Sequence, residues 1–437
     1  MVRLASVEFT KLKNVRSGTR LTFAQAGSVL LGKNGTGKTT LLQYLVALCT
    51  ADMSAFASDE PFDVSATFLL STGESASLRL TGTPSSQPAI PPDEASPYIT
   101  RYLPASESTR LEYRVASLDR SVEYRVSIVD GQAELYRNEQ SLCDPFSTQA
   151  FFSPLRSCLV RIEDLVRQND GSPLSVAGVA AFEFWWIPGA LCRYDESLDY
   201  FRMLTDENST YLSMEMTFLD RGKTNASRIR GNTSRFPHDL FSALTQGQNA
   251  NAHPAEFFSA SHSNVGFLRE FVKLCKFTGA SAIAPIEASR PVGDGVLFEW
   301  KLLRFTFDLG RARISHAKLS FGQKRLFSYL YYLACNRQIG IADELVNGMH
   351  HEWIEYCLGE ACADRQMFYT SQNPLLLDFL TFQSEAEVSQ RLIACKWDEQ
   401  DGFVWENLDA RVGQEFYRLY NTGIQHVSDI LRTKGWW

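Results

Sequence analysis

The stretch Gly32-Lys33-Asn34-Gly35-Thr36-Gly37-Lys38-Thr39 decides the fold, because it fits the pattern G-x-x-x-x-G-K-[ST] in full. The preceding run, Gly27–Leu31, is short and apolar and predicts a buried strand. The following residues, Thr40–Cys49, are largely apolar and contain neither Gly nor Pro, which predicts a helix. A strand, a glycine-rich loop and a helix in this order predict a P-loop.

The P-loop predicts where a nucleotide triphosphate and its metal bind. Its glycines let backbone N–H groups turn toward phosphate oxygens, and the N-terminal end of the helix favours anions. Lys38 is predicted to contact the β- and γ-phosphates, and the Thr39 hydroxyl to ligate Mg²⁺. We therefore expect ATP and Mg²⁺ as cofactors, with these nucleotide-binding residues: Gly32, Asn34, Gly35, Thr36, Gly37, Lys38, Thr39 and Thr40.

The bulk composition is that of an ordinary globular protein, with 44% apolar, 12% aromatic and 21% charged residues. The length of 437 residues predicts two or three structural units. A net charge of −7 argues against a surface that binds nucleic acid throughout. The N-terminus lacks the form of a signal peptide, and no apolar stretch is long enough to cross a bilayer. The nine cysteines form no C-x-x-C pair, so we expect free thiols in a cytoplasmic protein without a membrane partner.

Strand and helix patterns divide the chain into three parts. Candidate strands in the first part are Arg3–Thr10, Thr19–Phe23, Phe62–Leu70, Ser77–Leu80, Leu111–Ala116, Val122–Ile128 and Ala133–Tyr136, with a hairpin turn at Asp130-Gly131. Residues 83–97 are polar and Pro-rich and predict an exposed loop. Candidate helical patches follow at Cys158–Arg167, Ser175–Trp186, Leu198–Met203 and Val265–Thr278, and the strand pattern returns at Val296–Leu309. We predict a first lobe at 1–145, a mainly helical insertion at 146–285 and a second lobe at 286–437 that ends in a single C-terminal helix.

The segment Leu319-Ser320-Phe321-Gly322-Gln323-Lys324-Arg325 resembles the ABC signature motif, in the S-x-G-Q-x-R form of the SMC and RecF branch. By itself it also fits a helix N-terminus capped by Ser320. The resemblance implies that Ser320, Gly322 and Gln323 contact ATP held by the P-loop of another subunit. It therefore implies a homodimer or larger assembly with ATP at the interface.

The run Ile339-Gly340-Ile341-Ala342-Asp343-Glu344 resembles a Walker B strand, and it lies about 20 residues after the signature. The resemblance implies that Asp343 holds Mg²⁺ through water and that Glu344 orients or deprotonates the attacking water. The next residues, Leu345–His350, resemble the D-loop region. They depart from its pattern, because Leu345 replaces the usual Pro and Val346 the usual acid.

The run from Phe368 to Asp378 resembles the switch segment T-T-H-S-P-L-L-L-D of the same group. Gln372 stands where that segment has a histidine. An amide can hydrogen-bond water or phosphate, but it cannot take up a proton as imidazole can. We therefore predict catalytic roles for Lys38, Glu344 and Gln372, with ATP binding and a low rate of hydrolysis. A Q-loop glutamine has no identifiable position.

The spacing of the motifs separates three branches of the ABC class. About 280 residues lie between the P-loop and the signature, more than in a transporter ATPase. The intervening segment lacks heptads and contains prolines such as Pro154 and Pro237, which excludes a long coiled coil. The compact RecF-like and OLD-like ATPases remain. The 57 residues after Leu380 are too few for the Toprim nuclease domain of OLD proteins.

The resemblance to the SMC/RecF/OLD-like branch implies an α/β fold. It consists of an ABC-type P-loop ATPase head of two lobes, a mixed sheet plus an antiparallel β subdomain, and a mostly helical insertion. The chain resembles compact bacterial anti-phage defence ATPases, which implies a sensor or regulator with a separate effector such as a nuclease or toxin. Two alternatives remain open: a RecF-like DNA-repair ATPase, and a scaffold protein whose ATP is structural and barely hydrolysed.

Three weaker features complete the predictions. Five basic residues without an acid lie in a Gly/Ser/Asn/Thr-rich segment. They predict either contact with nucleic acid, ATP phosphate or an acidic partner, or a solvated loop: Arg221, Lys223, Arg228, Arg230 and Arg235. The terminal Trp436-Trp437 pair predicts either an interface anchor or intramolecular packing. His350-His351 matches no ligand spacing, so we expect no transition metal.

Overall fold

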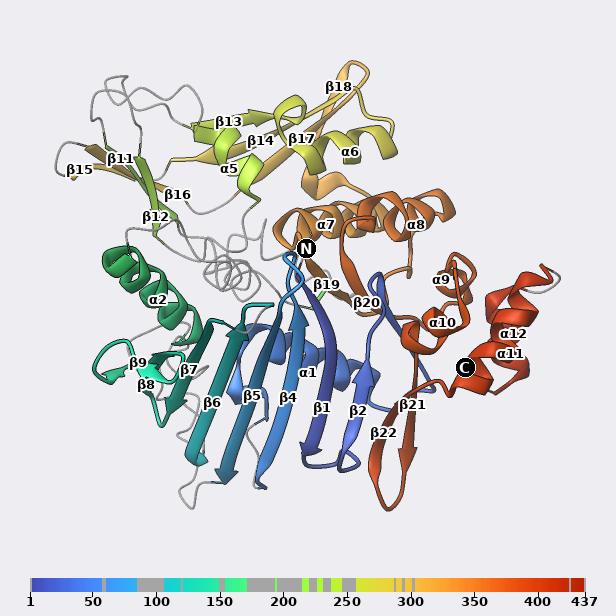
Figure 1. The fold of residues 1–437 in the computed structure, drawn as a ribbon. Coiled ribbons are helices and arrows are strands. Elements are labelled where there is room, and N and C mark those ends of the chain that lie inside the picture. The colour runs from blue at the N-terminus through green and yellow to red at the C-terminus, as the bar shows by residue number, and fades with distance from the viewer. Residues whose placement is uncertain are drawn as a thin grey trace. The chain divides into compact units, whose positions relative to one another are not determined.

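The computed structural model describes residues 2–56, 60–84, 106–118, 121–148, 154–170, 193–194, 214–219, 226–230, 237–245, 257–286, 288–292, 295–300, 303–423 and 426–435. The chain forms two compact units (Figure 1). The first comprises Met1–Arg193, Gln338–Asp343 and Ala363–Trp437, and the second comprises Tyr194–Arg337 and Glu344–Cys362. Both units are therefore assembled from segments far apart in the sequence.

An antiparallel sheet forms one layer of the first unit, in the order β10-β8-β7-β6-β5-β4-β1-β2 with β9 beside β8. Its strands are β1 (Arg3–Lys11), β2 (Thr19–Thr22), β4 (Phe62–Leu69), β5 (Ser75–Pro84), β6 (Ser106–Ala116), β7 (Glu123–Val129), β8 (Gln132–Arg137), β9 (Gln140–Ser141) and β10 (Phe146–Ser147). The strands predicted for the first lobe are confirmed, including the β7–β8 hairpin. Its turn places both Asp130 and Gly131 at positive φ, 49° and 77°.

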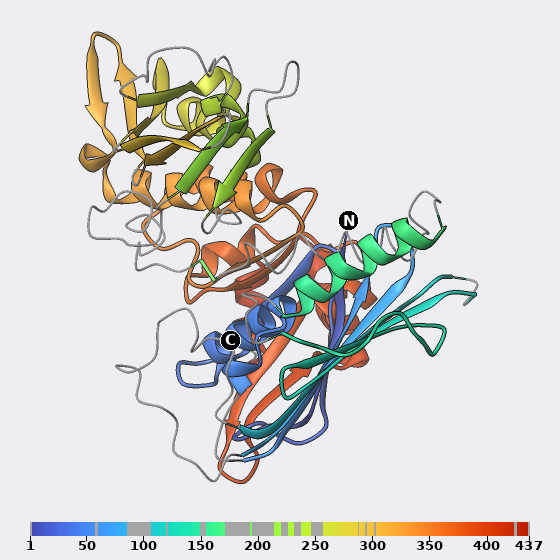
Figure 2. The same cartoon turned by 90° about the vertical axis from the view of Figure 1, so that its left-hand side faces the viewer.

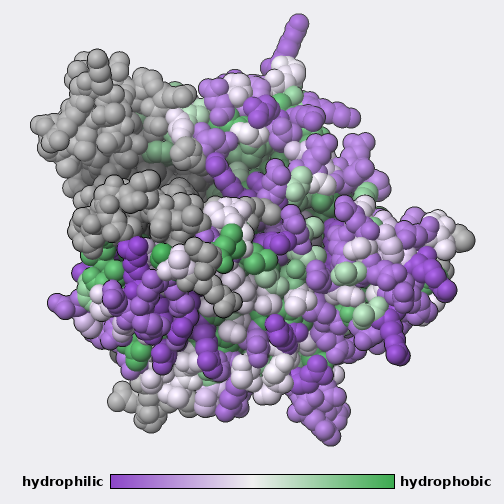
Figure 3. Space-filling view, in the orientation of Figure 1, coloured by the Kyte–Doolittle hydropathy of each residue, from purple (hydrophilic) through white to green (hydrophobic). Residues whose placement is uncertain are grey.

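The side chains of this sheet alternate between core and solvent. Along β4 every second residue is buried, from Phe62 to Phe68. Hydrophilic side chains are spread over the face of the molecule on which the sheet lies (Figure 3). The predicted loop at 83–97 begins with the last two residues of β5, and its remainder lies outside the described residues.

A second sheet of the first unit follows the order β19-β20-β3-β21-β22. Its strands are β3 (Gly27–Leu31), β19 (Ile339–Ala342), β20 (Gln366–Thr370), β21 (Leu392–Asp398) and β22 (Gly402–Asn407). The first four pair in parallel, and β21 and β22 form an antiparallel hairpin. All residues of β3, β19 and β20 are buried, as expected for parallel strands covered on both faces. The predicted combination of a mixed sheet and an antiparallel subdomain is confirmed.

The helices of the first unit are α1 (Lys38–Thr50), η1 (Met53–Phe56), α2 (Pro154–Asp170), α9 (Pro374–Asp378), α10 (Glu385–Arg391), α11 (Ala410–Asn421) and α12 (Val427–Thr433). Leu41, Leu45 and Leu48 of α1 join a core that includes residues from both sheets. α2 packs along β7 and β8 of the antiparallel sheet (Figure 2). The single C-terminal helix expected from the sequence is two helices, α11 and α12, because the chain turns through Gly423 at φ 65°.

The second unit contains two antiparallel sheets, with the orders β12-β11-β16-β15 and β13-β14-β17-β18. Their strands are β11 (Met214–Leu219), β12 (Ala226–Arg230), β13 (Phe257–Ser261), β14 (Gly279–Pro285), β15 (Ala288–Val292), β16 (Gly295–Trp300), β17 (Arg304–Leu309) and β18 (Ala312–Ser315). The helices are α5 (His238–Thr245), η4 (His262–Asn264), α6 (Gly266–Leu274), η5 (His316–Lys318), α7 (Phe321–Cys335), α8 (His351–Leu358) and η6 (Glu360–Cys362).

Aromatic rings form the core of the second unit. The ring of Phe327 on α7 meets those of Phe271, Phe305 and Phe307 at centroid distances of 5.1, 4.8 and 5.8 Å. Edge contacts of this kind add stability beyond the area that they bury. They attach α6 and α7 to the β14–β17 sheet.

The segment 146–285, expected to be mainly helical, contains strands as well as helices in its described residues. β11, β12, β13 and β14 accompany α2, α5 and α6. The strands β13 and β14, with the sequences FFSAS and GASAIAP, are rich in Ala and Ser, which carry little β propensity. The predicted patches at Ser175–Trp186 and Leu198–Met203 lie outside the described residues. Within the described ranges, no helix has the length and apolarity needed to span a membrane.

Candidate functional site

The loop between β3 and α1 adopts a backbone that requires glycine at two positions. Gly32 has φ 148°, and a Cβ there would lie 2.3 Å from the carbonyl oxygen of Cys395. Gly37 has φ 79°, and its Cβ would lie 2.6 Å from the ring of Phe403. L side chains avoid these conformations, and neither position has room for one. The loop is thus held closely against the β21–β22 hairpin.

The N-terminal end of α1 opens into this loop. Gly37 occupies the N-cap position and supplies no side-chain hydrogen bond to the first turn. Free N–H groups at a helix N-terminus attract phosphate. The ammonium of Lys38 donates to the carbonyl oxygens of Gly32 at 2.7 Å and Lys33 at 3.0 Å. Lys38 is buried. Burial raises the pKa of the nearby Cys395 thiol to about 12, and the positive charge of Lys38 offsets part of that rise.

Asp343 follows β19 and is the acidic centre of the first unit's site. Its Oδ2 accepts a hydrogen bond from the Thr39 hydroxyl at 2.8 Å. The same oxygen accepts from Nη1 of Arg193 at 2.9 Å. The hydroxyl of Thr370 donates to Oδ1. Asp343 is only 7% exposed, so these donors stabilise a carboxylate that is largely removed from water.

The pair Thr39 and Asp343 fits a magnesium ion. Hydroxyl and carboxylate oxygens are hard ligands of the kind that Mg²⁺ prefers, and Mg²⁺ in such sites is bound through one or two carboxylates plus phosphate oxygens. The two side chains meet at 2.8 Å, so Thr39 would ligate the ion and Asp343 would hold it through a bound water. Over the described ranges, no group of three or more His, Cys, Asp or Glu side chains could hold a metal.

Parallel pairing explains why residues so distant in sequence meet here. β19, β20 and β3 are neighbours and run in the same direction, so their carboxyl ends lie at one edge of the sheet. That edge carries Asp343 after β19, Gln372 after β20 and the P-loop after β3. Gln372 is exposed there. The helix that follows, α9, is capped by Asn373, whose Oδ1 accepts from the backbone N–H of Leu375 at 3.0 Å.

The other predicted P-loop residues have their positions in the same loop. Asn34, Gly35 and Thr39 are exposed, whereas Thr36 and Thr40 are partly buried. The carbonyl oxygen of Thr36 accepts from Nε1 of Trp405 at 3.3 Å. The first unit therefore brings together all of its predicted site residues, which are the P-loop, Asp343 and Gln372.

The signature segment lies in the second unit at the start of α7. Ser320 and Gln323 form a reciprocal capping box, with Ser320 Oγ accepting from Gln323 N and Gln323 Oε1 from Ser320 N, at 3.3 and 2.9 Å. The helix cap considered from the sequence is therefore present. Ser320 and Phe321 are nevertheless exposed, Phe321 by 56%. Gly322 is required, because a Cβ there would lie 2.6 Å from the carbonyl oxygen of Gly348.

Glu344 lies in the second unit with an unusual backbone, at φ 52°. Its carbonyl oxygen accepts from Nη2 of Arg325 at 2.7 Å, and that of Leu345 accepts from the same nitrogen at 3.1 Å. Its carboxylate Oε2 lies 3.4 Å from Nδ2 of Asn347. Arg325 is fully buried on α7, so the signature helix fixes the backbone on which Glu344 is presented.

The basic cluster, the histidine pair and the D-loop positions are described by the structure in part or in full, and the terminal tryptophans are not. Arg228 and Arg230 lie two positions apart in β12, and Arg221, Lys223 and Arg235 lie outside the described residues. Trp436 and Trp437 also lie outside them. His350 caps α8, and His351 is its first residue. Leu345 and Val346, which depart from the D-loop pattern, are buried.

Comparison with known families then identifies the chain. Residues 28–378 match the family described as "AAA domain, putative AbiEii toxin, Type IV TA system". The chain belongs to this family. The match runs from the P-loop strand to the end of the switch segment, so the AAA domain includes every motif described above. The predicted ABC-class P-loop ATPase of SMC/RecF-like type is thereby confirmed.

No curated protein sequence matches this AAA-domain protein. Solved structures similar to it include the SMC head domain from Thermotoga maritima, at 11% identity and a TM-score of 0.37, covering 93% of this chain and 99% of that one. Another is the Smc head domain with an extended coiled coil bound to the C-terminal domain of ScpA from Pyrococcus furiosus, at 10% identity and 0.37, covering 96% and 100%. A third is the Smc head domain with a coiled coil and joint from Pyrococcus yayanosii, at 9% identity and 0.37, with the same coverage.

Three polar residues of the AAA domain were not among the predicted site residues. Arg325 lies within the signature pattern, so its position in the motif was a usable signal. Thr370 lies in the switch segment, two residues before Gln372, and resembles a buried strand residue in sequence. Arg193 has no motif around it, and its contact with Asp343 spans 150 residues.

Proposed function

We propose that this chain binds Mg·ATP at the P-loop, hydrolyses it slowly and works as a nucleotide-driven dimer or oligomer switch in the cytoplasm. We further propose that it is the sensor or regulator component of a bacterial anti-phage defence system with a separate effector. The carrying observation is the 2.8 Å hydrogen bond from Thr39 at the P-loop to Asp343 after the Walker B strand. It joins the two elements that a Mg·ATP site needs.

Each site residue has a proposed role in binding. The backbone N–H groups of Gly35, Gly37 and the first turn of α1 surround the phosphates, as their position at the helix N-terminus favours. Lys38 moves its ammonium from the Gly32 and Lys33 carbonyls to the β- and γ-phosphate oxygens. Thr39 and Asp343 hold Mg²⁺, which neutralises charge on the β- and γ-phosphates when bound.

Hydrolysis in this proposal depends on Glu344 and Gln372. Glu344 orients or deprotonates the attacking water, and its backbone is fixed for that role by Arg325. Gln372 hydrogen-bonds the water or the γ-phosphate through its exposed amide. Because an amide neither takes up nor releases a proton near neutral pH, Gln372 cannot assist proton transfer. We therefore propose that ATP turnover is slow, as suits a switch.

The exposed signature segment supports self-association. Ser320 and Phe321 are exposed at the N-terminus of α7, a position that favours binding of an anion from another molecule. We propose that Ser320, Gly322 and Gln323 close over the ATP of a second copy. The family description names a putative toxin and a Type IV TA system, which supports a role beside a second polypeptide. We propose that this polypeptide is an effector such as a nuclease or toxin.

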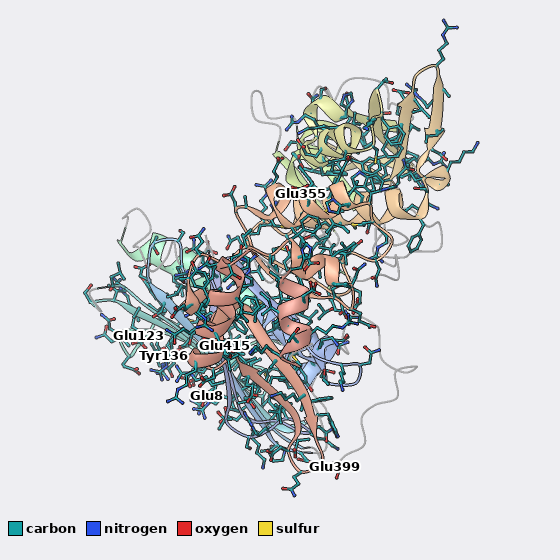
Figure 4. All side chains as sticks on the ribbon, turned by 90° about the vertical axis from the view of Figure 1, so that its right-hand side faces the viewer. Glu8, Glu123, Tyr136, Glu355, Glu399 and Glu415 are labelled. Carbon is teal, nitrogen blue, oxygen red and sulfur yellow. The ribbon has the colours of Figure 1, made fainter. Side chains whose placement is uncertain are left out.

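Phosphate release by purified full-length variants tests the enzymatic part. We expect Lys38→Ala to abolish nucleotide binding, whereas Lys11→Ala, at an exposed position at the end of β1, leaves it unchanged. We expect Glu344→Gln to bind ATP normally and release phosphate at least ~100-fold more slowly, since general base catalysis contributes about 10²–10⁴-fold. Glu355→Gln is the matched control, because Glu355 is an exposed carboxylate of α8 (Figure 4).

The same variants test the switch. ATP should convert Glu344→Gln from a monomer to a dimer or larger species in size-exclusion chromatography with light scattering, because the trapped ATP cannot be turned over. Equal near-zero phosphate release by wild type and Glu344→Gln would exclude the enzyme and favour a scaffold role. A monomer at saturating ATP would exclude the dimer switch.

A further inference from the structure

A cation of the chain itself lies on the carboxylate that we propose for Mg²⁺. Nη1 of Arg193 donates to Oδ2 of Asp343 at 2.9 Å, and Oδ2 is also the oxygen that accepts from Thr39. The side chains of Arg193 and Asp343 are 23% and 10% exposed. This ion pair is thus partly shielded from solvent, unlike most ion pairs on a protein surface.

The donors around Asp343 differ in what they can provide. Thr370 donates to Oδ1 and Thr39 donates to Oδ2, but both are neutral hydroxyls. Of the three side chains that donate to Asp343 in the described part of the chain, Arg193 alone brings positive charge. A carboxylate of low exposure requires a compensating charge or strong hydrogen bonds. The guanidinium of Arg193 supplies that charge at Oδ2 of Asp343.

Arg193 and a divalent cation would compete for one oxygen. Mg²⁺ keeps several of its waters, and one of these would donate to Oδ2 to join the ion to Asp343. Thr39 and Arg193 already donate to that oxygen and occupy its two lone pairs. Two cations within a few ångströms also repel each other strongly in a shielded site. Arg193 must therefore leave Oδ2 before Asp343 can accept from such a water and hold the metal through it.

Before the metal binds, Arg193 has a second effect. The carboxylate of Asp343 lies beside Thr39 at the phosphate end of the P-loop, where its negative charge would repel the triphosphate. The guanidinium cancels that charge. Arg193 should thus strengthen the binding of metal-free nucleotide and weaken the binding of the metal.

We propose that Arg193 is a positioning residue that neutralises Asp343 until the metal binds, and so sets the metal concentration at which the nucleotide site is loaded. This inference rests on the proposed ATP site. A purely structural role for Arg193 predicts that its loss weakens both ligands together. The proposed role predicts that its loss strengthens metal binding and weakens metal-free nucleotide binding.

The test uses full-length protein and two equilibrium titrations. Binding of Mn²⁺, which substitutes for Mg²⁺, is measured by electron paramagnetic resonance of the free ion, in the presence of a saturating non-hydrolysable ATP analogue. Binding of the same analogue is measured separately in EDTA. Arg193→Gln removes the charge, Arg193→Lys keeps it, and Arg391→Gln is the control, since it removes a 3.2 Å ion pair to Glu387 elsewhere in the same unit.

We expect Arg193→Gln to bind Mn²⁺ about tenfold more tightly and the metal-free analogue about tenfold more weakly, the ratio that one moderately strong charge interaction gives. Arg193→Lys should lie between Arg193→Gln and wild type, and Arg391→Gln should match wild type in both titrations. Thermal melts of each variant identify loss of folding, and Arg193→Lys keeps the test valid if Arg193→Gln does not fold.

The outcomes separate this inference from the proposed function. If wild type binds the analogue but Arg193→Gln matches it in both titrations, the role of Arg193 is wrong and the ATP site stands. If the variant weakens both ligands, Arg193 is structural and the inference is again wrong. If wild type binds no nucleotide at all, the proposed function fails and the inference fails with it.

Discussion

The hydroxyl of Thr39 donates a 2.8 Å hydrogen bond to Oδ2 of Asp343, across 304 residues of sequence. The contact forms because β3 and β19 lie in one parallel sheet, separated only by β20, and end at the same edge. Thr39 lies in the first turn of α1 and Asp343 follows β19, so the hydrogen bond joins the P-loop to the acidic end of β19.

Gly37→Ala should lower the free energy of unfolding by about 3 kcal/mol, combining left-handed strain with overpacking. The new Cβ would lie 2.6 Å from the ring of Phe403 at φ 79°. Gly35→Ala is the matched control, because Gly35 has φ 81° but no atom within 4 Å of the added Cβ. It should lose only about 1 kcal/mol. Urea denaturation measures both, and equal losses would show that contact with Phe403 is unimportant.

Arg325→Lys should lower kcat more than tenfold with little change in KM. A lysine ammonium cannot reproduce the guanidinium that holds the carbonyls of Glu344 and Leu345, so the backbone at Glu344 relaxes from φ 52°. Steady-state phosphate release measures the effect. Arg313→Lys serves as the control, because Arg313 forms an exposed pair with Asp308 in the same unit. A lower melting temperature with wild-type kcat would assign Arg325 a structural role only.

Gln372→His should raise the rate of phosphate release by about tenfold or more, since a positioned imidazole can act in proton transfer where an amide cannot. The pH profile of kcat should gain an inflection near about 6.5 that wild type lacks. Gln372→Asn, which keeps the amide, is the control and should show no new inflection. A slower Gln372→His enzyme with an unchanged profile would contradict the proposed position of Gln372.

Alkaline pH should destabilise the first unit through Cys395. Burial raises the pKa of its thiol to about 12, against the opposing charge of Lys38, whereas an unfolded thiol has a pKa of about 8.5. The folded state therefore keeps the proton longer, so this contribution is fully present below about pH 8.5 and is lost as pH rises toward 12. Between pH 8.5 and 10 the loss should be about 2 kcal/mol.

Urea denaturation of wild type and Cys395→Ala at pH 8 and pH 10 isolates that contribution. The alanine variant carries a constant offset from the lost contacts of the sulfur atom, but its stability should fall less between the two pH values. The same pH dependence in both proteins would show that Cys395 is not protected from ionisation in the native state.

Much of the fold was predictable because its signals are local. The alternation of Phe62–Leu70, the turn at Asp130-Gly131 and the run Thr40–Cys49 each specify their structure within a few residues. The P-loop glycines were equally informative, and the structure gives the reason: atoms of Cys395 and Phe403 occupy the space of their missing side chains. The strands β13 and β14 escaped prediction because Ala and Ser carry little signal.

Residues of the site could be predicted only where they belong to a sequence motif. Asp343 and the P-loop were found because each has a pattern of its own, and pairing in one sheet then brings them together. Arg193 could not be found, because a single arginine carries no periodicity and meets Asp343 only through tertiary folding. The positive φ of Glu344 could not be predicted from the sequence pattern either, because it accompanies a hydrogen bond from Arg325 on α7 to the Glu344 carbonyl.

Equilibrium binding of an ATP analogue to wild type and Asp343→Asn, each with Mg²⁺ and with EDTA, tests the central site directly. Asparagine keeps the size of the side chain and can still accept from Thr39, but it removes the charge that holds the metal. The account predicts that Mg²⁺ tightens binding of the analogue to wild type by about 100-fold. Mg²⁺ should have little effect on binding to Asp343→Asn. An equal gain from Mg²⁺ in both proteins would contradict a metal–nucleotide site formed by Thr39 and Asp343.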